Sequence, residues 1–256
     1  CFPNLKLSKD RIYVMFGFNG VCDIIKRMMS EKIDFIFIDN GYTTGRQRIH
    51  SDQPKHETTY SVTVNNTRLN YITKTSRCEP FLPYAKRKIG GELIVICPPS
   101  QFVAKAHGID IGEWVHNARR NLRHLDKPFI IREKQDVQTH GLFSKLLKDA
   151  ALVVTSQSLT GLESIVAGVP VVSDRFSLSA PVSNTIDTVY RNLEDLQFPG
   201  QKKFGKWVNS LRDNEVTIPK RKLTQLDYNA FGRVTKQQQR AFHNYEISDI
   251  QSQFAR

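Results

Sequence analysis

The sequence has few cysteines and no long apolar run. Its four cysteines, Cys1, Cys22, Cys78 and Cys97, form no C-x-x-C pair, so we expect reduced, mostly buried thiols rather than a zinc cluster. No apolar stretch approaches the roughly 20 residues that cross a bilayer. No positively charged segment leads into an apolar one, as a secretory signal would. The sequence therefore predicts a cytoplasmic protein without a membrane span.

Metal-ligand patterns are also missing. The seven histidines are scattered and do not form an H-x-x-x-H pair on a predicted helix, and no D-x-D motif follows a predicted strand. Such spacings are what metal sites on helices and strand ends require. We therefore expect no bound metal and no other cofactor.

Basic residues exceed acidic ones by a wide margin. Lys and Arg number 37 against 25 Asp and Glu, a formal net charge of +12. This excess favours a polyanionic partner such as nucleic acid, or an anionic membrane surface. The alternative is a charge that serves solubility alone. The 256 residues suit one large domain or two compact ones of about 100–150 residues each.

The first forty residues predict a βαβ unit. A β-rich run at Arg11–Phe16 precedes helical spacing over Val21–Glu31, and a second apolar run follows at Asp34–Ile38. The two strands should be parallel. Ligands of open α/β sheets bind at the carboxyl ends of such strands. Asp39 ends the second strand and is our candidate general base, although Asp39-Asn40-Gly41 is equally a turn signal.

Residues 43–90 are basic and polar. We expect cations there to hold nucleic-acid phosphates, namely Arg46, Arg48, Arg68, Lys74 and Arg77. Tyr60 or Tyr71 would stack on a base. The alternative is a solvated basic face on an enzyme that modifies carbohydrate or lipid.

The α/β pattern restarts after Gly90-Gly91. Predicted strands cover Glu92–Cys97, Pro128–Arg132, Ala151–Thr155 and Val169–Ser173. Predicted helices cover Ile111–Leu125, Leu142–Ala150 and Gly161–Ala167. We infer a second parallel sheet. Beyond residue 199 the pattern loosens into basic clusters, with a closing helix over Thr235–Phe254.

Hydroxyl residues gather where the third of these strands meets its helix. Ser156, Ser158 and Thr160 precede a helix that we expect to begin near Thr160-Gly161. The exposed amides and the positive dipole end of such a helix start would form an anion site, and Gly161 would let a phosphate approach. Glu163, in the first turn, could accept both hydroxyls of a ribose. An ordinary β-α-β unit with a good N-cap explains the same residues.

Two further strand ends carry polar side chains. Arg132 and Lys134 lie at alternate positions after Ile131, a spacing suited to a diphosphate. A solvated strand end is the alternative. Ser100 follows Pro98-Pro99, and its hydroxyl could meet a phosphate.

The segment from Ser158 to Val171 resembles a donor-site signature of GT-B glycosyltransferases, S-T-G-x-E-x-x-x-x-G-x-P-V, which sugar-nucleotide 2-epimerases share. By this match Glu163 would bind ribose, and Ser158, Thr160 and Gly161 the diphosphate. The family often reads IIRPKP where this chain has Ile130–Gln135, with Glu133 and Gln135 in place of prolines.

The first part of the chain resembles small glycosyltransferase-like proteins of tailed phages. The matching pieces are Phe16-Gly17, Ile38–Tyr42 and Ile96–Ser100. Phe16 replaces the usual Trp and Asn40 the usual Arg. The resemblance implies an α/β, compact GT-B-like fold with two Rossmann-like domains, parallel sheets and a cleft between them. It places Gly17, Asn19, Gly41 and Tyr42 in acceptor-side loops.

We therefore expect a metal-independent glycosyltransferase that moves sugar from a nucleotide-sugar, expected to be a UDP-sugar, to a hydroxyl. The expected acceptor is a hydroxymethylated base of double-stranded phage DNA in the host cytoplasm, flipped out of the helix. The predicted segments are 1–90 (acceptor side), 91–198 (sugar-nucleotide binding) and 199–256 (basic extension). Two alternatives stay open: a glycosyltransferase or epimerase acting on small molecules or cell-surface glycans, and a non-catalytic nucleic-acid-binding protein.

Overall fold

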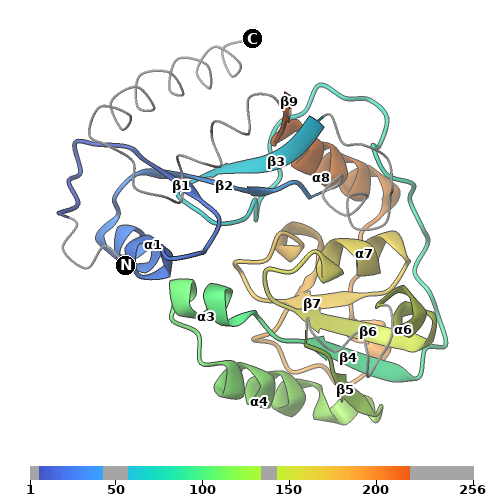
Figure 1. The fold of residues 1–256 in the computed structure, drawn as a ribbon. Helices are drawn as coiled ribbons and strands as arrows, with labels where there is room; N and C mark the ends of the chain where they lie inside the picture. The colour runs from blue at the N-terminus through green and yellow to red at the C-terminus, as the bar shows by residue number, and fades with distance from the viewer. Residues whose placement is uncertain (1–5, 43–56, 134–142, 220–256) are drawn as a thin grey trace.

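Two separate β-sheets organise the chain (Figure 1). The computed structural model describes residues 6–42, 57–133 and 143–219. Sheet A has the strand order β1-β2-β3-β9, and sheet B has the order β5-β4-β6-β7-β8. The predicted α/β class is confirmed. The closing helix predicted over 235–254 lies outside the described residues.

Sheet A is mixed rather than wholly parallel. The predicted βαβ unit is confirmed: β1 (Tyr13–Phe16) and β2 (Phe35–Asn40) pair in parallel around α1 (Cys22–Glu31). However, β3 (Glu57–Val64) and β9 (Glu215–Pro219) each add an antiparallel pairing. β2 and β3 are consecutive in the chain and adjacent in the sheet, an arrangement that an antiparallel pair reaches without a crossover helix. The predicted all-parallel sheet is therefore corrected here.

Sheet B is parallel throughout, as predicted. Its strands are β4 (Leu93–Cys97), β5 (Phe129–Ile131), β6 (Ala150–Thr155), β7 (Val171–Ser173) and β8 (Asn184–Thr185). Every residue of β6 is buried. Continuous apolar strands of this kind occur where helices cover both faces of a sheet.

Helices cover sheet B on two sides. Side chains from α6 (Phe143–Asp149), α7 (Thr160–Val166) and α8 (Gln201–Asp213) share one core. On the other face lies α4 (Ile111–Leu122), which precedes the short 3-10 helix η1 (Arg123–Leu125). Two further 3-10 turns, η2 (Ala180–Val182) and η3 (Leu193–Asp195), lie in the chain between β7 and α8.

Two helices lie outside the sequence-based prediction. The first, α3 (Gln101–His107), packs on α1: the Cys22 thiol donates to the Phe102 carbonyl at 3.4 Å, and Lys105 pairs with Asp23 at 2.8 Å. The second is α8, whose buried side chains follow an i, i+3, i+4, i+7 spacing; they are Phe204, Trp207, Val208 and Leu211. Both helices bring sheet A and sheet B together.

The chain between β3 and β4 is a strap that docks along α8 (Figure 1). Its Thr73 amide donates to the Ser210 hydroxyl at 2.8 Å, and its Phe81 amide donates to Asn209 Oδ1 at 2.9 Å. Of the basic residues predicted to form a surface here, Lys74 and Arg77 are exposed and Arg68 is partly buried. The division at residues 90 and 198 stays a prediction.

Candidate functional site

The carboxyl edge of sheet B carries most of the predicted donor-binding residues. From β4 the chain moves to β5 on one side and then to β6 on the other. This reversal makes the space between the ends of β4 and β6 the switch point, where α/β sheets bind ligands. The loops that reach it begin at Pro98 and Ser156.

Arg132 lies beside this point, at the carboxyl end of β5. It directly follows β5, its amide donates to the Ile96 carbonyl at 2.8 Å, and its residue is only 9% exposed. The guanidinium carbon lies 5.2 Å from the centroid of the Phe143 ring. In the part of the chain that the structure describes, its Nε has no acceptor and the guanidinium pairs with no carboxylate. Its predicted companion, Lys134, is outside the described residues.

Cys97 ends β4 and is buried. Burial raises the pKa of the Cys97 thiol to about 12, opposed by the charge of Arg132 and a contact with Thr160, and supported by the charge of Glu163. The thiol stays protonated at neutral pH and is not a nucleophile.

The start of α7 differs from the predicted open anion site. The Thr160 amide donates to the Ser158 hydroxyl and the Gly161 amide to the Ser158 carbonyl, both at 3.3 Å. The Glu163 amide donates to the Leu159 carbonyl at 3.0 Å. The expectation that these amides are exposed is corrected, because the tight turn after β6 supplies acceptors locally. A donor-binding role for these residues stays a prediction.

Gly161 has a packing reason to be glycine. A Cβ at this position would lie 2.6 Å from Ser179 Oγ and 3.0 Å from Ser179 Cβ. Ser179 is buried and its hydroxyl bonds to that of Ser177 at 2.8 Å. The space that we predicted for a phosphate on this side of Gly161 is filled by Ser179.

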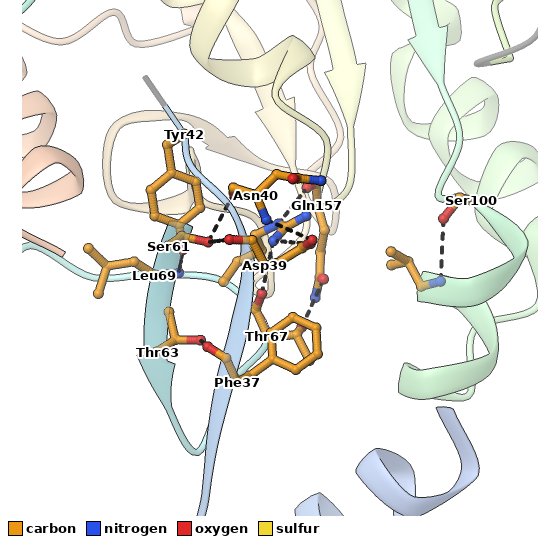
Figure 2. Close-up of polar contacts among 12 residues, drawn as sticks. Phe37, Asp39, Asn40, Tyr42, Ser61, Thr63, Thr67, Leu69, Ser100 and Gln157 are labelled. Atoms are coloured by element: carbon orange, nitrogen blue, oxygen red, sulfur yellow. Dashed lines mark hydrogen bonds and ion pairs between the residues drawn. The ribbon is translucent and has the colours of Figure 1, made fainter. Parts of the chain in front are cut away.

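The two other predicted serine contacts differ in their surroundings. Ser100 is the N-cap of α3, and its hydroxyl accepts from the Val103 amide at 3.4 Å (Figure 2). Ser156 is buried beside Asp174. Burial raises the pKa of the Asp174 carboxyl, and the Ser156 hydroxyl opposes that shift.

At the carboxyl end of β2 in sheet A, Asp39 is paired with Arg68. Asp39 Oδ2 lies 2.7 Å from Arg68 Nη1, and the two side chains are 16% and 14% exposed. Asp39 Oδ1 accepts from the Asn40 amide at 2.8 Å. Figure 2 shows this carboxylate at the end of β2, as predicted from the sequence.

Arg68 also reaches the switch point of sheet B. Its Nε donates to the Gln157 carbonyl at 3.3 Å. The neighbouring Thr67 hydroxyl donates to Gln157 Oε1 at 2.9 Å, and Gln157 Nε2 lies 2.7 Å from His107 Nε2. This network, drawn in part in Figure 2, ties the loop after β6 to sheet A. Its members are distant in sequence, and sequence reasoning missed Thr67, His107 and Gln157.

His107 is neutral within this network. Burial, assisted by the nearby positive charge of Arg68, lowers its pKa from the ordinary 6.5 to about 4. His107 Nε2 also lies 2.8 Å from the Thr67 hydroxyl oxygen. The ring of Phe176 lies 4.7 Å from the His107 ring.

Of the four residues predicted in acceptor-side loops, three make hydrogen bonds within the fold and one is exposed. Gly17 and Gly41 donate their amides to Ile38 and Thr59 carbonyls, at 2.8 and 3.0 Å. Tyr42 is buried, and its hydroxyl accepts from the Leu69 amide at 3.0 Å. Burial raises the Tyr42 pKa. Asn19 is exposed.

Some of the predicted nucleic-acid contacts form ion pairs within the protein and others are exposed. Arg68 pairs with Asp39, and Arg77 pairs with Asp213 at 2.6 Å. Lys74 and Tyr71 are exposed, whereas Tyr60 is buried against the Phe16 ring. Arg46 and Arg48 lie outside the described residues. A DNA-binding role for these positions stays a prediction.

Searches for metal and membrane features found none in the described ranges. No group of three or more His, Cys, Asp and Glu side chains within residues 6–42, 57–133 and 143–219 could hold a metal ion. Over the same ranges, no helix is both long and apolar enough to span a bilayer.

Comparison with known proteins gives a distant structural likeness. The chain is similar to the solved β-Kdo 2,4-transferase KpsC of Thermosulfurimonas dismutans, with 11% identity and a TM-score of 0.40 over 77% of this chain and 78% of that one. A likeness this distant carries no information on substrate or partner. No protein-family model matches the chain, and no curated protein matches it.

Proposed function

We propose that this protein is a GT-B-type glycosyltransferase that uses a nucleotide-sugar donor. One observation carries the proposal: the guanidinium of Arg132 is buried at the carboxyl edge of sheet B and has no carboxylate partner in the described ranges. A buried charge without a partner is costly. A bound diphosphate would compensate it, since guanidinium and phosphate match in geometry as well as in charge.

The helix after β6 supports a nucleoside diphosphate over a simple anion. Thr160 and Glu163 lie in the first turn of α7, which follows β6, the strand beside β4. In the glycosyltransferase signature that the segment after β6 resembles, the matching Glu binds the ribose. Arg132 would then stabilise the diphosphate as it leaves, without a metal ion.

Asp39 is the proposed general base. In the transfer step, the acceptor oxygen would bond to the anomeric carbon of the sugar while the bond from that carbon to the diphosphate breaks. The acceptor proton would pass to Asp39, and the leaving diphosphate would keep its negative charge beside Arg132. The Arg68 side chain joins the Asp39 carboxylate to the loop after β6, which supports a common site.

For the acceptor, we propose a hydroxymethylated base of double-stranded DNA. The net charge of +12 supports a polyanionic substrate. Lys74, exposed on the strap, is free to contact phosphates in a way that the ion-paired Arg77 is not.

Mass spectrometry of nucleosides tests both parts of the proposal. Hydroxymethylated DNA would be incubated with the protein and UDP-glucose, UDP-galactose, UDP-N-acetylglucosamine or GDP-mannose, then digested. A nucleoside heavier by one sugar is the expected result. Sugar transferred only to small hydroxyl acceptors would refute the DNA acceptor but keep the transferase. No transfer and no thermal shift with any of these donors would refute the enzyme.

Binding of the donor can be tested separately with a Glu163 variant. We expect Glu163→Ala to weaken UDP binding about tenfold, the loss of roughly 1.4 kcal/mol of interaction with the ribose. Isothermal titration calorimetry measures this directly. Glu113→Ala, which changes an exposed acid in the first turn of α4, is the matched control and should bind UDP as the wild type does.

A further inference from the structure

Arg68 is the described cation that contacts both the proposed base and the donor loop. Its Nη1 lies 2.7 Å from Asp39 Oδ2, and its Nε donates to the Gln157 carbonyl at 3.3 Å. Asp39 belongs to sheet A, whereas Gln157 follows β6 of sheet B. One planar side chain therefore spans the two halves of the proposed site.

Both ends of this bridge are held in place. The Gln157 side chain is 2% exposed and is fixed by the Thr67 hydroxyl at 2.9 Å and by His107 at 2.7 Å. At the other end, the Asn40 amide donates to Asp39 Oδ1 at 2.8 Å. The guanidinium group itself lies 6.0 Å from the Tyr42 ring centroid. With so many fixed neighbours, the guanidinium has little freedom to rotate toward a ligand.

We propose that Arg68 is a positioning residue: it holds the Asp39 carboxylate in register with the loop that binds the donor, rather than contacting DNA phosphate. This inference rests on the proposed glycosyltransferase function. The geometry of the guanidinium fork explains why the residue is arginine. Its Nε and Nη1 point to different acceptors in one plane, which a lysine ammonium at the end of a flexible chain does not reproduce.

The proposal predicts how kinetic constants separate. If Arg68 acts through Asp39, its loss should lower kcat and leave the KM for the nucleotide-sugar nearly unchanged. A DNA-binding role would instead raise the KM for DNA and weaken DNA binding in a salt-dependent manner. A purely structural role would lower the melting temperature and leave kcat of the folded fraction intact.

A double-mutant cycle with Asp39→Asn and Arg68→Met tests the inference. We expect Arg68→Met alone to lower kcat about 100-fold, an effect on the scale of losing one positioned polar group. In the Asp39→Asn background the same change should have less than a twofold further effect, because the group that it positions is already inactive. Arg27→Met breaks the exposed Arg27–Glu31 pair on α1 and should leave kcat unchanged.

The outcomes separate the inference from the proposed function. Transfer by the wild type with independent, multiplicative effects of the two substitutions would overturn the positioning role and leave the glycosyltransferase intact. A rise in the KM for DNA with an unchanged kcat would do the same. No transfer by the wild type overturns both. If Arg68→Met does not fold, Arg68→Lys replaces it in the cycle, since lysine keeps the charge and loses the two-point bridge.

Discussion

The two sheets treat their charged edge residues in opposite ways. At the edge of sheet A, Asp39 has a partner, Arg68, at 2.7 Å. At the edge of sheet B, Arg132 is more deeply buried and has no carboxylate partner in the described residues. Asp39 lies at the end of β2 and Arg132 directly follows β5, and each strand belongs to a parallel pair. The two positions therefore differ in their ion-pair partners and not in topology.

This difference assigns separate tasks to the two edges. A paired carboxylate is fixed in direction, which suits a group that must meet one acceptor proton. An uncompensated cation suits the binding of a ligand that brings the missing negative charge. Four experiments test this contrast between the two sheets.

Removing the carboxylate at sheet A should have the largest effect. We expect Asp39→Asn to lower kcat by about 1,000-fold or more, since general-base catalysis contributes roughly 100- to 10,000-fold. Donor affinity should stay near that of the wild type. Rates of sugar transfer and calorimetry with UDP measure the two quantities. Asp126→Asn, at an exposed position, is the control, and a fully active Asp39→Asn enzyme would exclude Asp39 as the base.

Removing the cation at sheet B should have the next effect. We expect Arg132→Ala to lower turnover about 100-fold, the typical result of deleting one group that stabilises transition-state charge. Arg119→Ala removes another guanidinium that lies over a ring, at 5.8 Å from the Phe129 centroid, and should be silent. Equal losses in both variants would mean that the unpaired state of Arg132 has no functional meaning.

Crowding the turn at the start of α7 should cost stability. A Cβ at Gly161 would meet Ser179 Oγ at 2.6 Å, so Gly161→Ala should lower the free energy of unfolding by about 1–3 kcal/mol. Adding Ser179→Gly should restore most of that loss. Urea denaturation measures it, with Gly200→Ala as control because a Cβ there meets open space. No rescue by the second change would disprove the packing explanation.

Acid should loosen the contact between the sheets. The pKa of His107 is about 4 in the folded protein against an ordinary 6.5, so the unfolded state binds the proton first as pH falls. The free energy of unfolding should therefore decrease between about pH 6.5 and 4, by about 1–3 kcal/mol. Urea titrations across this range should show a smaller decrease for His107→Gln. His116→Gln, at an exposed site, should behave as the wild type.

Local pattern was sufficient for the apolar strands of both sheets and for most helices, but it missed β8 and β9. Apolar runs such as Leu93–Cys97 and Ala151–Val154 are buried most easily as inner strands of a sheet. The parallel β1–β2 and β4–β6 pairings could therefore be predicted from the sequence. The i, i+3, i+4, i+7 pattern of α8 was readable too, but its lysines and Gly205 obscured it. Ser100 was predicted to contact a phosphate, but its position as the N-cap of α3 accounts for a serine there without a ligand.

Tertiary context decided the rest. Arg68 and Asp39 are 29 positions apart, and their pairing depends on the path of the strap, which no periodicity reports. Likewise, the exposed amides expected at Thr160 and Gly161 depended on whether the preceding turn would supply acceptors. Ser158 does so through both its hydroxyl and its carbonyl. The neutral His107 follows from burial between two elements far apart in the chain.

The last strand of sheet A has a consequence for synthesis. Because β9 pairs with β3 from Glu57↔Pro219 to Ser61↔Glu215, the N-terminal sheet is completed only after all of sheet B has left the ribosome. Until then β3 exposes unpaired backbone groups on that side, and such edges invite pairing with other chains. Truncation before residue 215 should therefore yield an aggregating product rather than a shortened, well-behaved protein.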